Sequence, residues 1–198
     1  MSPSPLAHSF ELTLPEWSHA FIQRAGDYFS SLEDRVLLTL KAARENFERD
    51  SGGPFAAAVF EADSGRLVSL GVNRVVPSAC SSAHAEIMAL SLAQRRLASF
   101  DLGARGLPAH QLVVNWRPCA MCFGAIPWSG IRSLVLAGGG PVMEKLTGFD
   151  EGPIHPEWSQ ELERRGISVT EGVLESEALR LFEDFANSGR LVYNGRQG

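Results

Sequence analysis

The sequence has little cysteine: Cys80, Cys119 and Cys122 are the only three among 198 residues. Such a small, odd number argues against a framework of disulfides as the source of stability. Cys119 and Cys122 form a C-x-x-C pair, which in a chain of this kind indicates metal or redox chemistry. The remaining cysteine, Cys80, stands alone in a predicted loop, and we expect it to be structural.

Long hydrophobic runs are also missing, so no membrane-spanning segment is expected. The first residues lack the basic region and apolar core of a signal peptide, which predicts a cytoplasmic location. Positive charge is scarce as well, because 18 basic residues face 23 acidic ones and the net charge is -5 at pH 7. A nucleic-acid binder needs a basic stripe to neutralise phosphates. The sequence therefore predicts no nucleic-acid partner and a small, uncharged or weakly polar substrate.

The length and the 44% hydrophobic content fit one well-packed α/β domain with an added segment. We expect residues 1–30 to form an N-terminal helical appendage and residues 31–198 to form the main domain. Within the appendage, Thr13 and Glu16 have the spacing of a capping box at a helix start. The aromatic residues expected on one face of the appendage are Trp17, Phe21 and Phe29.

Beyond residue 30, hydrophobic periodicity and turn residues predict the order α-β-β-α-β-α-β-(α)-β-α. The first of these helices is expected to begin at Ser30 and to end before Ser51. Strands are expected at 55–60, 67–72, 112–114, 134–137 and 167–169, and the later helices at 83–98, 118–130, 157–165 and 175–188. The segment between residues 138 and 156 is expected to be irregular. This order is typical of a layered α/β domain around one sheet.

Two short motifs carry the chemistry, His84-Ala85-Glu86 and Pro118-Cys119-Ala120-Met121-Cys122. Each stands at the start of a predicted helix, where backbone dipoles favour thiolate. The i, i+3 spacing places Cys119 and Cys122 on one side of the first helical turn. One imidazole and two thiolates make a neutral zinc site with a fourth position left for water. The predicted metal ligands are therefore His84, Cys119 and Cys122, which would hold one Zn²⁺ per subunit.

Glu86 follows His84 by two residues and would project about 200° away from it on a helix. It is therefore expected to act as the general base beside a metal-bound water rather than as a ligand. The combined pattern H-x-E…P-C-x-x-C is the signature of zinc-dependent base deaminases. Alone, the C-x-x-C pair would fit a redox motif or half of a structural zinc site equally well, but a structural site would need a fourth protein ligand.

From about residue 50 to the C-terminus, the sequence resembles the cytidine-deaminase superfamily and, within it, the bacterial guanine deaminases. The zinc motifs indicate the superfamily, whereas Trp128 and the segment Gly148-Phe149-Asp150 indicate guanine. The resemblance implies a three-layer α-β-α cytidine-deaminase-like fold with a mixed five-stranded sheet. It also implies a homodimer, whose C-terminal segment can be swapped between subunits.

The same resemblance implies roles in substrate binding. Asn73 would hydrogen-bond the purine ring, although an asparagine after a strand is also a common turn residue. Phe55 and Trp128 would enclose the base, although aromatic residues are more often simple core. The backbone of Ala85 would contact the ring. Tyr193 would close the pocket of its own or of the partner subunit, or it would serve only in packing.

The reaction implied is hydrolytic deamination of guanine to xanthine and ammonia, a step of purine catabolism carried out by a hydrolase of C–N bonds in cyclic amidines. Glu86 would move the first proton. A second acid would be needed to protonate the departing amine, and the candidates are Glu144 and Asp150, together with the neighbouring Glu151. A solvated acidic loop is the alternative interpretation of these three carboxylates.

Two residues depart from the family pattern. Arg117 stands where most relatives carry a glutamate, and it either points outward, reshapes the pocket or attracts an anionic group on the substrate. Pro127 would remove one helix hydrogen bond and kink or end the last turn before Trp128. The sequence therefore leaves room for other substrates: a triazine, a pterin, guanosine, cytidine or tRNA adenosine. A catalytically silent zinc-stabilised binding protein is a further alternative, against which the intact Glu86 speaks.

Overall fold

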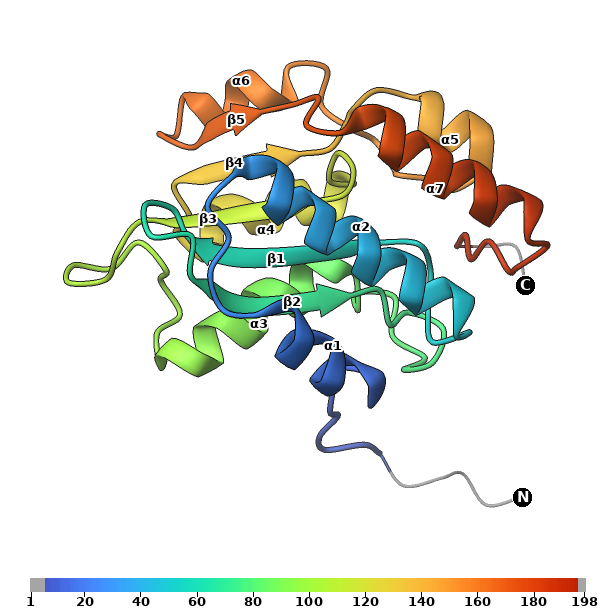
Figure 1. Ribbon diagram of the computed structural model, residues 1–198, viewed down its shortest axis with the longest axis horizontal. Helices are drawn as coiled ribbons and strands as arrows, with labels where there is room; N and C mark the ends of the chain where they lie inside the picture. The colour runs from blue at the N-terminus through green and yellow to red at the C-terminus, as the bar shows by residue number, and fades with distance from the viewer. Residues whose placement is uncertain (1–5, 196–198) are drawn as a thin grey trace.

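The centre of the molecule is a mixed sheet of five strands in the order β2-β1-β3-β4-β5 (Figure 1). The computed structural model describes residues 6–195. β1 pairs antiparallel with β2 and β3, whereas β3, β4 and β5 run parallel. The strands are β1 (Ala56–Glu61), β2 (Leu67–Val72), β3 (His110–Val114), β4 (Ser133–Leu136) and β5 (Ser168–Thr170). The helices are α1 (Trp17–Ala25), α2 (Leu32–Glu48), α3 (Ala85–Leu97), α4 (Ala120–Ser129), α5 (Val142–Thr147), α6 (Trp158–Glu163) and α7 (Glu175–Asn187).

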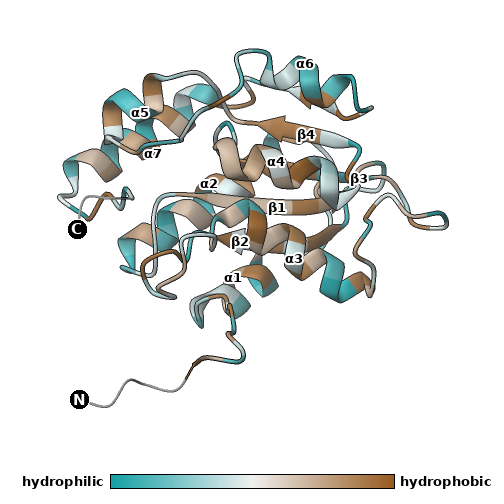
Figure 2. Ribbon diagram, turned by 180° about the vertical axis from the view of Figure 1, so that it is seen from behind, coloured by the Kyte–Doolittle hydropathy of each residue, from teal (hydrophilic) through white to brown (hydrophobic). Residues whose placement is uncertain are grey.

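Helices cover both faces of this sheet, so that two hydrophobic cores form (Figure 2). The core beneath α2 and α7 takes Ala58 and Phe60 of β1, whereas the core beneath α3 and α4 takes Ala57 and Val59. The alternation follows from the two-residue period of a strand. Because both faces are covered, β1 and β3 are buried along nearly their whole length. The predicted three-layer α-β-α fold with a mixed five-stranded sheet is confirmed.

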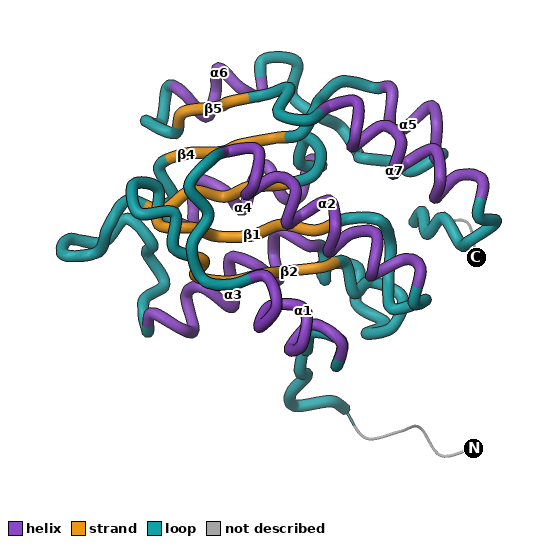
Figure 3. The backbone as a smooth tube through the Cα atoms, in the orientation of Figure 1, coloured by secondary structure: helices purple, strands orange, loops and turns teal. Residues whose placement is uncertain are grey.

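Most elements lie within two residues of their predicted bounds, and the differences have local causes. Ser31, not Ser30, caps α2, because its hydroxyl accepts from the amide of Asp34 at 3.0 Å. The predicted capping box is wrong: α1 begins after Glu16 without a side-chain cap. The segment expected to be irregular contains α5, a helix of six residues (Figure 3). It packs against α7, a tertiary contact that local sequence does not reveal.

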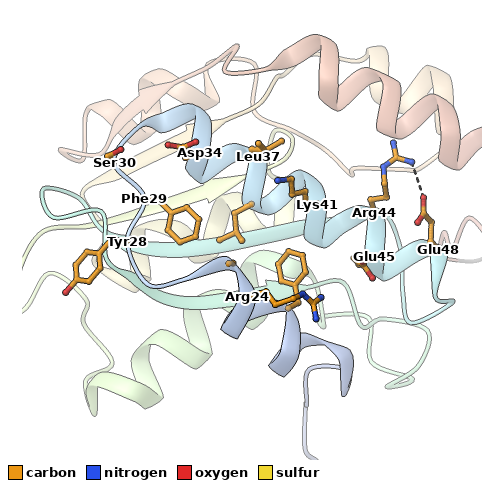
Figure 4. Close-up of a pocket in the computed structure, with 13 residues that line it drawn as sticks. Arg24, Tyr28, Phe29, Ser30, Asp34, Leu37, Lys41, Arg44, Glu45 and Glu48 are labelled. Carbon is orange, nitrogen blue, oxygen red and sulfur yellow. Dashed lines mark hydrogen bonds and ion pairs between the residues drawn. The ribbon is translucent and has the colours of Figure 1, made fainter.

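The N-terminal helix α1 lies beside α2, and the rings of Trp17 and Phe21 meet edge to face at 5.6 Å. Both residues pack against the core beneath α2, as predicted for the aromatic face of this segment. A cavity of about 640 Å³ separates α1 from α2, with Tyr28 and Lys41 among its lining residues (Figure 4). None of the residues lining this cavity is a predicted site residue. Across residues 6–195, no helix combines the length and hydrophobicity needed to cross a bilayer.

Candidate metal centre and active site

The three predicted metal ligands converge where two helices begin. His84 is the N-cap of α3, and Cys119 is the N-cap of α4, with Cys122 one turn further on. Their ligand atoms all lie within 4.8 Å of one another. Nδ1 of His84 is 3.5 Å from Sγ of Cys119, and the amide of Cys122 donates to the same sulfur at 3.5 Å. The i, i+3 spacing and the helix starts therefore bring together the residues that the sequence singled out.

Close packing of β2 against α3 fixes the position of His84. A Cβ atom at Gly71 of β2 would lie 2.2 Å from the carbonyl oxygen of Ala85 and 2.4 Å from the amide nitrogen of Ala89. Both contacts are with backbone atoms, which cannot turn aside as a side chain does. Only glycine therefore allows β2 to approach the first turn of α3 so closely.

The donor set fits zinc. Cys119 and Cys122 are buried, and His84 is half-buried. A hydrogen bond from Cys122, aided by His84, lowers the pKa of Cys119 to about 4 despite its burial. Two thiolates and one imidazole are typical zinc ligands, and three protein ligands leave the open position that distinguishes a catalytic site from a closed structural one.

Glu86 is buried beside this cluster, with 5% of its surface exposed. Burial raises the pKa of its carboxyl to about 7, and the negative charge of Cys119 adds to the shift. A carboxyl with a pKa near neutrality is suited to accept a proton in one step and to return it in the next. The geometry thus allows Glu86 the part of general base that its place in the motif predicts.

A cavity of about 380 Å³ opens on this cluster, with His84, Cys80 and Glu151 in its wall. The rings of Phe149 and Tyr193 also line it and lie 5.1 Å apart. Tyr193 approaches His84 of its own chain, with 6.4 Å between the ring centroids. A small heterocycle fits a cavity of this size, which is at the lower end of the range for small-molecule sites.

Asn73 is almost fully buried and contacts Tyr193, which lines the cavity. Its side-chain oxygen accepts from the amides of Gly53 and Val75, and its side-chain nitrogen donates to the hydroxyl of Tyr193. The side chain of Asn73 thus organises the local backbone, as expected for a turn residue. It also contacts Tyr193, so the turn role is compatible with a role in substrate binding. Ala85 is the first residue of α3, where an amide has no partner within the helix.

The two aromatic residues expected to enclose the base lie in different places. Phe55 packs against Phe149 at 5.1 Å, and Phe149 lines the cavity. Trp128 is 86% exposed and borders a separate cavity beside α3. It follows Cys119 by nine residues and therefore projects about 180° away from it on α4. The expectation that Trp128 encloses the base is not met within a single chain.

The two candidate second acids, Glu144 and Asp150, have different surroundings. Glu144 forms an ion pair with Arg117, and the side chains are 21% and 12% exposed. The carboxylate of Asp150 accepts from the amide of Gly152 at the surface. Glu144 is thus committed to an arginine, whereas Asp150 lines the cavity described above but is exposed and bonded within its own loop.

Glu151 is the carboxylate that meets the cluster. Its carbonyl oxygen accepts from the amide of Ala120 at 3.0 Å, which joins its segment to the start of α4. Burial and the nearby charges of Cys119 and Glu86 raise its pKa to about 8. The sequence did not rank Glu151 first, because the direction of a side chain in an irregular segment has no periodic signal.

The two departures from the family pattern have local explanations. Arg117 does not point into solvent; it binds Glu144, which lies on α5. Pro127 is accommodated inside α4, and the helix continues for two residues before Gly130 ends it in a left-handed conformation. Neither residue displaces the cluster of His84, Cys119 and Cys122.

Residues 30–138 match the family "Cytidine and deoxycytidylate deaminase zinc-binding region". The chain therefore belongs to this family of deaminases, which are hydrolases of C–N bonds. Among solved structures, it is similar to a guanine deaminase from Nitrosomonas europaea, with 46% identity over 93% of this chain and 100% of that chain, and a TM-score of 0.85. The guanine deaminase of Bacillus subtilis is 32% identical over 73% of this chain and 87% of its own length. A tRNA-specific adenosine deaminase of Agrobacterium fabrum is 30% identical over 78% of this chain and 93% of its own length. The predicted membership of the cytidine-deaminase superfamily is confirmed.

Proposed function

We propose that this protein catalyses the hydrolytic deamination of guanine to xanthine and ammonia. The observation that carries the proposal is the cluster of His84, Cys119 and Cys122 with buried Glu86 beside it, at a cavity of about 380 Å³ that His84 lines. The similarity to guanine deaminases from two bacteria supports guanine over other aminated heterocycles.

Zinc held by the three ligands would supply Lewis acidity that lowers the pKa of a coordinated water. Glu86 takes a proton from the attacking water and delivers it to the ring nitrogen next to C2 of guanine. A C–O bond forms at C2, and the bond from C2 to the exocyclic nitrogen breaks. The amine leaves with an added proton as ammonia, so one water is consumed for each guanine.

The substrate is held, in this proposal, by residues that the family resemblance implies, of which Tyr193 lines the cavity and Asn73 contacts Tyr193. Asn73 and the backbone of Ala85 hydrogen-bond the purine, and Tyr193 closes the pocket from the same chain. Phe55 acts through Phe149, which offers its ring to the base.

Glu151 is proposed as the second acid in place of Glu144 and Asp150. Glu151→Gln should lower kcat for guanine about 100-fold, because the leaving amine loses its proton donor. Asp150→Asn tests the neighbouring carboxyl, which also lines the cavity but is exposed, and it should lower kcat less than Glu151→Gln does. Steady-state kinetics decide between them. A larger loss in Asp150→Asn than in Glu151→Gln would contradict the assignment.

Several properties of the assembled protein are proposals of the same kind. We propose one zinc ion with a bound water per subunit, a homodimer, and a place in purine catabolism. Free thiols suit a reducing compartment, which supports the cytoplasm. The exposed indole of Trp128 supports a dimer, because large apolar side chains in solvent often mark interfaces. The division into residues 1–30 and 31–198 and the swap of the C-terminal segment between subunits stay predictions.

Ammonia release from a panel of amines tests the substrate. The panel contains guanine, guanosine, cytosine, cytidine, a triazine such as ammeline, and a tRNA anticodon stem-loop with adenosine. We expect kcat/KM for guanine to exceed that for every other member by at least about 100-fold, since a pocket built to hydrogen-bond one base rejects those that leave its polar groups unpaired. A preference for another amine would overturn guanine as the substrate. No ammonia release from any member of the panel would favour the alternative of a catalytically silent, zinc-stabilised binding protein.

A further inference from the structure

The N-terminal segment reaches the substrate site through a chain of hydrogen bonds that begins at Trp17. The indole Nε1 of Trp17 donates to the hydroxyl of Ser51 at 2.9 Å. That hydroxyl donates in turn toward Oδ1 of Asn46 at 2.9 Å and the carbonyl oxygen of Asn46 at 3.0 Å. Ser51 follows α2 and opens the loop that leads into β1, so α1 is tied to that loop by a polar contact as well as by packing.

Asn46 continues this chain of hydrogen bonds toward Asn73. It is fully buried, and its side-chain nitrogen donates at 2.9 Å both to the carbonyl oxygen of Gly53 and to that of Asn73. One amide group thus cross-links the loop before β1 and the loop after β2. Its side-chain nitrogen donates twice and its side-chain oxygen accepts from Ser51, so both polar atoms of this buried amide have partners inside the protein.

The two loops touch backbone to backbone at this point. A Cβ atom at Gly52 would lie 1.8 Å from the carbonyl oxygen of Asn73 and 2.6 Å from Nδ2 of Asn46. The next residue, Gly53, also contacts Asn73, because its amide donates to Oδ1 of Asn73. The position of Asn73 is therefore set by the loop that Ser51 begins.

Arg74 makes a second link between the N-terminal segment and these two loops. The guanidinium of Arg74 donates to the carbonyl oxygen of Ser51 and, at 3.2 Å, to the carbonyl oxygen of Thr13. Arg74 is the residue after Asn73, so the N-terminal segment binds directly beside the proposed substrate ligand. Thr13 and Trp17 thus hold the two loops from the outside while Asn46 holds them from within.

We infer that the N-terminal segment is a positioning element of the active site, in which Trp17, Ser51 and Asn46 fix the orientation of Asn73 toward the substrate. The inference rests on the proposed function for the meaning of Asn73, but the network itself does not depend on the substrate. It assigns a role to residues that neither bind metal nor line the substrate cavity.

Kinetics of paired variants test the inference. Trp17→Phe keeps an aromatic ring and removes only the indole donor, and Ser51→Ala cuts the next link. Each should raise KM for guanine about fivefold with kcat within twofold, because loss of one hydrogen bond loosens Asn73 without touching the proton carriers. Ser51→Thr restores a hydroxyl and should return KM to within twofold of the parent value.

Ser31→Ala is the matched control for destabilisation, because it removes the cap at the opposite end of α2. It should lower Tm while leaving KM unchanged. Equal KM values in Trp17→Phe, Ser51→Ala and Ser31→Ala would overturn the inference. So would a fall in kcat that matches a loss of folded or zinc-loaded protein.

Amide hydrogen exchange gives a readout that needs no substrate. The amides of Gly53 and Val75, which both donate to Asn73, should exchange at least threefold faster in Trp17→Phe than in the parent and in Ser31→Ala. Unchanged exchange at both amides would overturn the network. If the parent protein were inactive on guanine, the proposed function would fail and this measurement would still decide the inference.

Discussion

Glu86→Gln is expected to lower kcat for guanine about 1000-fold while zinc stays bound. The amide of glutamine has nearly the shape of the carboxyl but cannot accept and return a proton. Glu86 is 5% exposed, so bulk water has little access to replace it as the base. Because Glu86 is not one of the three clustered ligands, its replacement leaves the metal donors in place. Ammonia release and metal analysis on the same preparation measure both effects.

Glu183→Gln is the control for this variant, since Glu183 is an exposed carboxylate on α7. It makes the same chemical change away from the cluster and should leave kcat and zinc content unaltered. Turnover by Glu86→Gln within tenfold of the parent, with zinc retained, would contradict the role of Glu86. A loss of zinc from Glu86→Gln would instead place Glu86 among the ligands.

Cys122→Ser should abolish both zinc binding and turnover. Cys122 is fully buried and supplies one of only three clustered ligand atoms in the described part of the chain. With His84 and Cys119 alone, two protein ligands remain, fewer than either structural or catalytic zinc sites use. We expect the zinc content after gel filtration to fall below one tenth of the parent value. Tm should fall as well, because metal binding contributes to folding.

The chain offers its own control in the third cysteine. Cys80 lines the cavity but lies outside the cluster of ligand atoms. Cys80→Ser should keep the zinc content of the parent, whereas Cys119→Ser should behave like Cys122→Ser. Zinc retention in Cys122→Ser, or zinc loss in Cys80→Ser, would show that the ligand set is different from the one proposed.

The metal cluster was predictable from the sequence because local rules determine most of it. Cys119 and Cys122 share one turn of a helix, and both motifs stand where predicted helices begin. The buried strands were predictable for a similar reason: they are continuous apolar runs bounded by turn residues. Spacing along the chain thus sets the distance between Cys119 and Cys122, whereas the sheet brings His84 to them.

Other parts of the site depend on contacts that spacing does not encode. Burial and the charges of the cluster act on the carboxyl of Glu151, whereas the adjacent Asp150 is exposed on the wall of the same cavity, and no period distinguishes two neighbours in a loop. Helical geometry alone would have placed Trp128 opposite Cys119, yet the family resemblance favoured a place in the pocket. The link from Trp17 to Asn46 joins residues 29 positions apart through Ser51, and only the fold brings them together.

The most direct test of the proposed function is to incubate the zinc-loaded protein with guanine in water enriched in oxygen-18 and to analyse the products by mass spectrometry. We expect xanthine with a single oxygen-18 atom at C2 and an equal amount of ammonia, formed about 1000-fold more slowly by Glu86→Gln under the same conditions. Unchanged guanine, or xanthine without the label, would contradict hydrolytic deamination at this site.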